Sequence, residues 1–106
     1  MIDTLQAIAE PNRLSILQLM RNAELSAGEV AGHFKEISRP AVSQHLRVLK
    51  KAGLIAERRQ GTSRIYRLRP EGFESLKALL ENFWDSRLEK LKTAAEKEER
   101  KKRKKS

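Results

Sequence analysis

The sequence predicts a mainly α-helical domain with one small β-hairpin, and three observations support this α+β fold class. Up to about residue 52, apolar residues recur every three or four positions, which is typical of amphipathic helices. After Gly53 the pattern changes to alternation on both sides of a turn at Gly61. Helical spacing returns after Pro70. The 106-residue chain is expected to form one domain over residues 1–95, followed by a basic tail over 96–106 that does not fold alone.

The first two helices are predicted from short apolar patterns with a break between them. Leu5 and Ile8 indicate a helix over residues 3–9. The run Glu10-Pro11-Asn12 ends this helix and opens a second one with a broad apolar face, and residues 22–25 are then expected to form a turn.

The next two helices have clear start signals. Ser26 and Glu29 match a capping box, which predicts a helix from there to about Phe34. After a short link, Ser38 is a good N-cap for a helix over 39–52, with Pro40 in its first turn, where its missing N–H costs little. Two short helices joined by a tight turn predict a helix-turn-helix.

The helix over 39–52 has two contrasting faces. Its apolar stripe is formed by Val42, Leu46 and Leu49. The opposite face carries amides, hydroxyls and cations but no carboxylate, so it is arranged to meet an anion; it comprises Pro40, Ser43, Gln44, Arg47 and Lys51.

A hairpin follows this helix, and a hairpin after a helix-turn-helix is a wing. The turn at residues 61–63 separates two strands. In the second strand we expect Ile65 and Leu68 to face the core, and Arg64 and Tyr66 to face away from it.

A long helix is predicted from about Glu71 to Lys92. Its apolar positions cover more of its surface than one small domain is expected to bury, which indicates a partner subunit. Phe83 and Trp84 stand side by side in it, and replacing both by alanine is expected to dissociate a dimer.

The charge is concentrated in the middle of the chain. The net charge is +9, and residues 35–69 hold ten lysines and arginines against two glutamates. Such a localised basic segment is typical of a protein that binds nucleic acid.

Several classes of function are excluded or disfavoured. The chain has no cysteine, which excludes disulfides and thiolate metal sites. No apolar run approaches the ~20 residues of a membrane span, and no signal-peptide pattern is present, so a cytoplasmic protein is expected. No Gly-rich phosphate loop or metal-ligand cluster is present, and neither histidine has a nucleophile and carboxylate nearby in the sequence, so an enzyme is not expected.

At this point the chain resembles the ArsR-type winged-helix repressors of bacteria. The resemblance rests on AEPNRLSILQLM, LSAGEVA, SRPAVSQHLRVLKKAGLI and the RRQGTSRIYRL hairpin, and it covers about residues 2–92. It implies a homodimer whose first and last helices pack at the two-fold axis, and which binds inverted-repeat operators and represses transcription, often of its own operon. The residues assigned to this interface are Leu5, Ile8, Leu76, Leu80, Phe83, Trp84, Leu88 and Leu91.

The residue chemistry predicts how DNA would be bound. Ser43, Gln44 and Arg47 can bond to base edges in the major groove, and the resemblance adds His45 to this groove-facing group. The N-terminus of the same helix would anchor phosphates. The full predicted surface consists of Ser38, Arg39, Pro40, Ser43, Gln44, His45, Arg47, Lys51, Arg58, Arg59, Thr62, Ser63, Arg64 and Tyr66.

Two members of this set have open alternatives. Tyr66 can stack at the base of the wing, donate its hydroxyl to a phosphate, or pack in the core. His45 can contact DNA or pack beside Ala41 and Val48.

The features that give many ArsR-type proteins a metal response are missing. Residues 25–29 hold no thiolate, and the last predicted helix offers Asp85 and Glu89 but no histidine, so neither metal nor cofactor is expected. The signal that would relieve repression is not predicted: it can be a small organic ligand or a protein partner, or the protein can act without any inducer. The alternative functions are a non-specific architectural DNA-binding protein and a winged-helix module for protein contacts.

Overall fold

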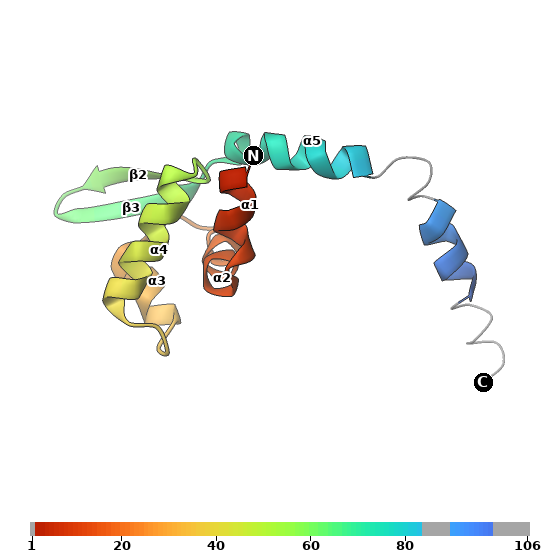
Figure 1. Ribbon diagram of the computed structural model, residues 1–106. Helices are drawn as coiled ribbons and strands as arrows, with labels where there is room; N and C mark the ends of the chain where they lie inside the picture. Colours follow the sequence, from red (N-terminus) through yellow and green to blue (C-terminus); the bar gives the residue numbers. More distant parts are fainter. Residues whose placement is uncertain (1, 84–89, 99–106) are drawn as a thin grey trace. The chain divides into compact units, whose positions relative to one another are not determined.

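Four helices precede the hairpin in the computed structural model, which describes residues 2–83 and 90–98 (Figure 1). They are α1 (Ile2–Ala9), α2 (Pro11–Leu19), α3 (Ala27–His33) and α4 (Arg39–Lys51). All four lie within two residues of their predicted bounds or start signals, because each begins or ends at a capping residue, a proline or a glycine.

The junction of α1 and α2 is fixed by polar contacts. The Glu10 carboxylate caps α2 by accepting a hydrogen bond from the Arg13 backbone N–H at 2.8 Å. The Arg13 guanidinium in turn donates to the backbone oxygens of Ala7 (2.7 Å) and Gln6 (3.1 Å) at the end of α1. One arginine therefore satisfies carbonyls that the end of a helix would otherwise leave unpaired.

The predicted caps of α3 and α4 are confirmed. The Ser26 hydroxyl accepts from the Glu29 backbone N–H at 3.1 Å, and the Glu29 carboxylate accepts from the Ser26 backbone N–H at 2.9 Å. The Ser38 hydroxyl accepts from the Ala41 N–H at 3.2 Å. Gly53 follows α4 with a φ of 79°, the left-handed conformation in which glycine commonly ends helices.

The sheet has three antiparallel strands in the order β1-β3-β2, one more than the sequence predicted. β2 (Ile55–Gln60) and β3 (Ser63–Leu68) form the predicted hairpin around Gly61, which has a φ of 63°. β1 (Leu25–Ser26) pairs with Tyr66 and Ile65 of β3, so the turn predicted over residues 22–25 ends in a short strand. Figure 1 shows the hairpin extending beyond the helices.

The core contains the apolar stripe of α4, as predicted, and one tyrosine that was placed wrongly. Val42, Leu46 and Leu49 are at most 1% exposed and pack with residues of α2, α3 and the sheet. Tyr66 is only 7% exposed, so the prediction that it faces away from the core is wrong. It lies on the central strand β3, between Leu25 of β1 and Glu57 of β2, and its side chain belongs to the core cluster.

The predicted helix after Pro70 begins as a 3-10 turn, Pro70–Phe73, and continues as α5 (Glu74–Phe83). Residues 90–98 are also helical. This helix runs past the predicted end at Lys92 and includes residues 96–98 of the predicted tail, so the expected start of the tail is wrong. Trp84, Leu88 and residues 99–106 lie outside the described residues.

The contacts divide the chain into two units, which separate between Leu76 and Lys77. The first unit holds the helix-turn-helix and the hairpin, and the predicted boundary at residue 95 falls within the second. Among the described residues, no helix is long and apolar enough to cross a membrane.

Candidate DNA-binding surface

The outward face of α4 is exposed and polar, as the sequence predicted. Ser43, Gln44 and Arg47 are exposed, while the apolar stripe of the same helix is buried. The Arg47 guanidinium donates to the Gln44 side-chain oxygen at 2.8 Å, which holds the two base-reading candidates together. An amide and a guanidinium arranged in this way can pair with the edges of adenine and guanine.

The two ends of α4 carry further exposed cations. Ser38, Arg39 and Pro40 are exposed at its start, and Lys51 is exposed at its end. A Cβ at Gly28 of α3 would lie 3.1 Å from the Arg39 Nη2 atom, so the missing side chain at Gly28 leaves room for this guanidinium. Both ends of the helix therefore offer positive charge beside the base-reading face.

The cations of the hairpin differ in their partners. Arg58 donates to Glu24 at 2.6 Å and to the Gln60 side chain at 2.7 Å, so much of its charge is neutralised. Arg59 is exposed and has no carboxylate partner within the described part of the chain, and Thr62 and Ser63 are exposed at the tip. Of the three wing arginines that the sequence predicted to meet DNA, Arg59 therefore lacks a carboxylate partner among the described residues, whereas Arg58 lies beside Glu24 and Arg64 beside Glu57.

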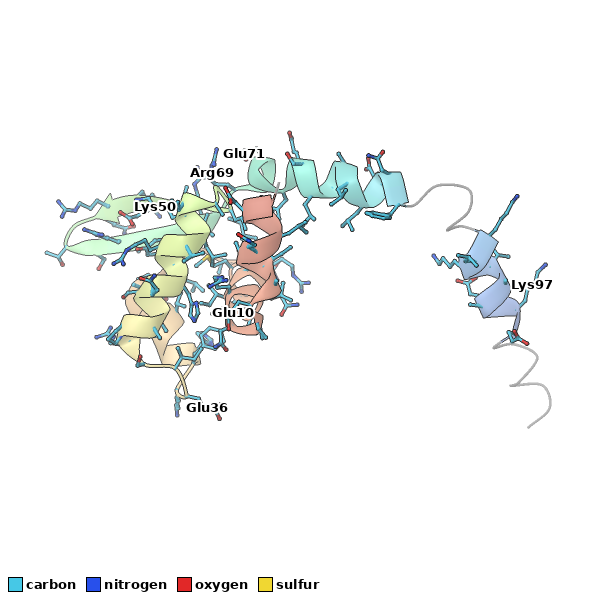
Figure 2. The ribbon with its side chains drawn as sticks, viewed as in Figure 1. Glu10, Glu36, Lys50, Arg69, Glu71 and Lys97 are labelled. Carbon is cyan, nitrogen blue, oxygen red and sulfur yellow. The ribbon has the colours of Figure 1, made fainter. Side chains whose placement is uncertain are left out.

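A third ion-pair group connects α4 with the hairpin. The Glu57 carboxylate lies 3.6 Å from the Lys50 ammonium and 3.9 Å from the Arg64 guanidinium. We call Lys50, Glu57 and Arg64 the Glu57 cluster; Figure 2 labels Lys50, which projects from α4 near the hairpin. Lys50 and Glu57 were not among the predicted site residues, because their proximity depends on how the hairpin folds against the helix.

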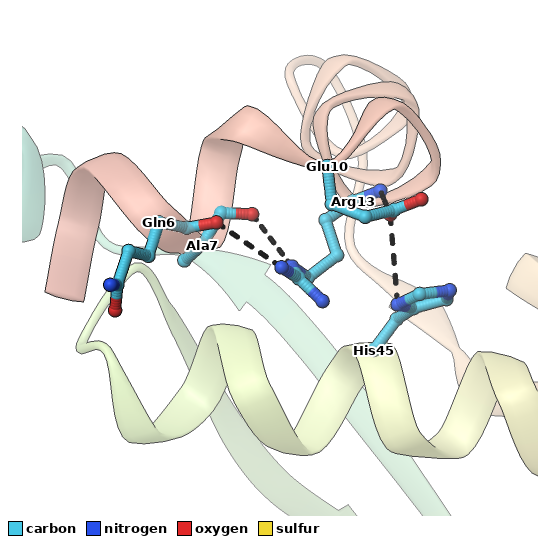
Figure 3. Close-up of polar contacts among 5 residues, drawn as sticks. All are labelled: Gln6, Ala7, Glu10, Arg13 and His45. Atoms are coloured by element: carbon cyan, nitrogen blue, oxygen red, sulfur yellow. Dashed lines mark hydrogen bonds and ion pairs between the residues drawn. The ribbon is translucent and has the colours of Figure 1, made fainter.

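His45 lies on the inner side of α4, against the start of α2 (Figure 3). Its side chain is 16% exposed, and its Nδ1 atom is 3.8 Å from a Glu10 carboxylate oxygen and has no hydrogen-bond partner. Burial alone would raise the pKa of Glu10, but the backbone N–H groups of Arg13 and Asn12, together with His45, lower it below its ordinary value. Of the two roles left open for His45, packing fits this position.

Tyr66 is likewise turned toward the protein. Burial raises the pKa of its hydroxyl, and the Glu57 carboxylate adds to the rise. Its side chain packs in the core, which fits the core-packing alternative and not the contact with DNA.

The residues assigned to the dimer interface are mostly exposed within their own units. Phe83 is 63% exposed, and Ile8 and Leu76 are half-buried. Leu5, Leu80 and Leu91 of this set are exposed as well, and so is Leu14, which was not assigned to the interface. Among residues 2–83 and 90–98, no group of three His, Asp or Glu side chains could hold a metal ion.

A helix-turn-helix whose second helix presents an exposed polar face, followed by a β-hairpin, defines a winged-helix DNA-binding protein. A family model described as a helix-turn-helix domain matches residues 8–58. The HTH-type transcriptional regulator Rv2034 of Mycobacterium tuberculosis is 44% identical over 79 residues, which are 74% of this chain and 73% of that protein. The transcriptional repressor SdpR of Bacillus subtilis is 40% identical over 68 residues, 64% of this chain and 74% of that protein.

Other similar proteins extend the comparison to structure and to the direction of regulation. The transcriptional activator HlyU of Vibrio cholerae is 34% identical over 80 residues, 76% of this chain and 73% of that protein. The crystal structure of a "possible transcriptional regulator for arsenical resistance" has a TM-score of 0.73 and 44% identity, and the match covers 86% of this chain and 94% of that one. The chain belongs to the ArsR family of bacterial winged-helix transcriptional regulators and is not an enzyme.

Proposed function

We propose that this chain is a transcriptional repressor that binds, as a homodimer, an inverted-repeat operator upstream of its own operon. The observation that carries the proposal is the exposed face of α4, which combines Ser43, Gln44 and Arg47 without a carboxylate. Amide, hydroxyl and guanidinium groups in a major groove can distinguish bases, whereas a purely cationic face would hold only phosphates.

Each part of the surface has a distinct role in this proposal. Gln44 and Arg47 read base edges, with Ser43 beside them. Arg39 and the free amides at the start of α4 contact phosphates, and Arg59 contacts the flanking minor groove or its phosphates. His45 and Tyr66 support the surface from within and make no contact with DNA.

The exposed apolar residues support a second copy of the chain as the partner. Leu80 and Phe83 of α5 are exposed, as is Leu5 of α1. Water contact costs roughly 25 cal/mol for each Å² of such surface, so covering it on both subunits would stabilise a dimer. Replacing Leu80 and Phe83 together by aspartate should give a folded monomer that binds DNA weakly; an unchanged mass in sedimentation would reject this interface.

A DNA titration tests the proposed specificity. The full chain is titrated, at several salt concentrations, into the DNA upstream of its own gene and into scrambled DNA of equal length. Preference for the upstream DNA by ~10³ or more at physiological salt is expected for a sequence-specific regulator. Equal, salt-sensitive binding to both would instead support an architectural DNA-binding protein, or place the operator elsewhere.

A reporter assay tests the direction of regulation. The relatives include a protein named as a repressor and one named as an activator, so DNA binding alone does not decide it. Expression from the upstream region should rise when the chain is absent or carries Arg47→Ala. A fall in expression would reject repression while leaving operator binding intact.

A further inference from the structure

A cleft separates the recognition helix α4 from the wing, and the Glu57 cluster lies in its wall. The cleft has a volume of about 320 Å³, and Ser43 and Arg47 line it together with all three members of the cluster. Leu46 and Tyr66 contribute to its lining from the core side. Both walls are held by secondary structure: the helix supplies Lys50, and the two hairpin strands supply Glu57 and Arg64.

The charges in this cleft favour an anion. Arg47, Lys50 and Arg64 contribute three positive charges, and Glu57 contributes one negative charge. The two oxygens of Glu57 face different cations, Oε2 toward Lys50 and Oε1 toward Arg64. Since the Glu57 side chain is 20% exposed, its carboxylate is already partly withdrawn from water beside the two cations.

The binding mode proposed above would place a phosphate strand over this cleft. The proposed function sets α4 in the major groove and the wing at the flanking minor groove or its phosphates. Adjacent grooves are separated by the sugar-phosphate backbone, so that backbone crosses between helix and wing. Under the proposed function, phosphates therefore approach Lys50 and Arg64 from the open side of the cleft.

We propose that this cleft is a phosphate-binding site for the DNA backbone, in which Lys50 and Arg64 are the cations and Glu57 is an internal counter-ion that weakens binding. In the free protein the Glu57 carboxylate lies 3.6 Å from Lys50 and 3.9 Å from Arg64 and offsets part of their charge. A DNA phosphate must share these cations with it, so the carboxylate lowers DNA affinity and reduces the number of counterions released. The inference rests on the proposed function, since it requires α4 and the wing to straddle one backbone.

Three single substitutions in the full chain test the proposal, with the salt dependence of DNA affinity as the readout. Glu57→Gln keeps the shape of the side chain and frees Lys50 and Arg64. Gaining one phosphate contact per subunit should steepen the slope of log K against log salt by about two, so that affinity rises as the salt concentration falls. Lys50→Gln should do the opposite and flatten the slope.

The matched control is Glu71→Gln, which makes the same charge change at a carboxylate paired with Arg69 at 3.2 Å, outside the cleft. It should leave the slope unchanged. Equal salt slopes of DNA affinity for Glu57→Gln and Glu71→Gln would overturn the proposal. Circular dichroism verifies that each variant is folded.

The two proposals can fail separately. If the unsubstituted chain binds upstream and scrambled DNA equally, the operator proposal fails, although the slopes can still show the phosphate site. If it discriminates between the two DNAs but Glu57→Gln leaves both slopes unchanged, the phosphate site fails alone.

Discussion

The two neighbouring arginines of the wing provide the sharpest test of how the structure controls DNA affinity. Arg58 is neutralised by Glu24 at 2.6 Å, whereas Arg59 has no carboxylate partner in the described part of the chain. Both are exposed and adjacent in β2, where their side chains point to opposite faces of the strand. We therefore expect Arg59→Gln to weaken DNA binding and Arg58→Gln to have little effect.

The magnitude follows from the number of unpaired cations. On α4 and the hairpin, the predicted DNA-contacting cations without a carboxylate partner among the described residues are Arg39, Arg47, Lys51 and Arg59. A cation that lies on a phosphate contributes about 0.9 to the slope of log K against log salt, so one such cation per subunit contributes about two in a dimer. Arg59→Gln removes one per subunit and should flatten the slope by about two, whereas Arg58→Gln should leave it nearly unchanged.

Fluorescence anisotropy with labelled upstream DNA, at several salt concentrations, measures these slopes. Glu24→Gln offers the converse test, because it releases Arg58 and should steepen the slope. Equal slopes for Arg58→Gln and Arg59→Gln would refute the reasoning that intramolecular pairing decides which arginines hold DNA. A flat salt response of the unsubstituted chain would count against DNA binding through phosphates altogether.

Three further predictions concern stability and are measured by urea unfolding. Ser38→Ala removes the cap of α4 and should cost about 1 kcal/mol; an unchanged stability would mean that the cap contributes nothing. Gly72→Ala should destabilise the protein, because a Cβ there would collide with the backbone of the turn after α4. At Gly32 a Cβ meets open space, so Gly32→Ala should stabilise the protein by roughly 0.5–1 kcal/mol. Equal changes in stability for the two variants would contradict this prediction. The pKa values of Glu10 and Glu29 are lowered in the folded state. The two carboxylates therefore stabilise the fold at pH values above their unfolded pKa, and this stabilisation is lost as the pH falls through their folded pKa. Replacing both by glutamine should make the loss of stability below about pH 4 smaller, and an unchanged pH profile would contradict this.

The parts of the fold that were predicted correctly depend on local chemistry. The capping box of Ser26 and Glu29, the cap at Ser38 and the helix end at Gly53 all act within four residues of the chain. Such signals can be recognised without knowing the tertiary structure. The apolar stripe of α4 was also predictable, since its period alone shows which side is buried.

The parts that were missed depend on residues distant in sequence. β1 is only two residues long and is defined by its pairing with Tyr66 and Ile65, some 40 residues later. Alternation along β3 shows that two faces exist but not which one meets the helices, which is why Tyr66 was turned the wrong way. The partner of Arg58 could not be predicted for the same reason, because Glu24 is 34 residues away.

The most direct test of the central claim is selection from a library of randomised duplex DNA by the full chain. If the face formed by Ser43, Gln44 and Arg47 reads bases, the enriched sequences should contain two inverted half-sites centred about one helical turn apart. The Gln44→Ala variant should lose its preference at one position of each half-site, while its overall affinity changes little. Retained binding without any enriched sequence would contradict sequence reading by α4.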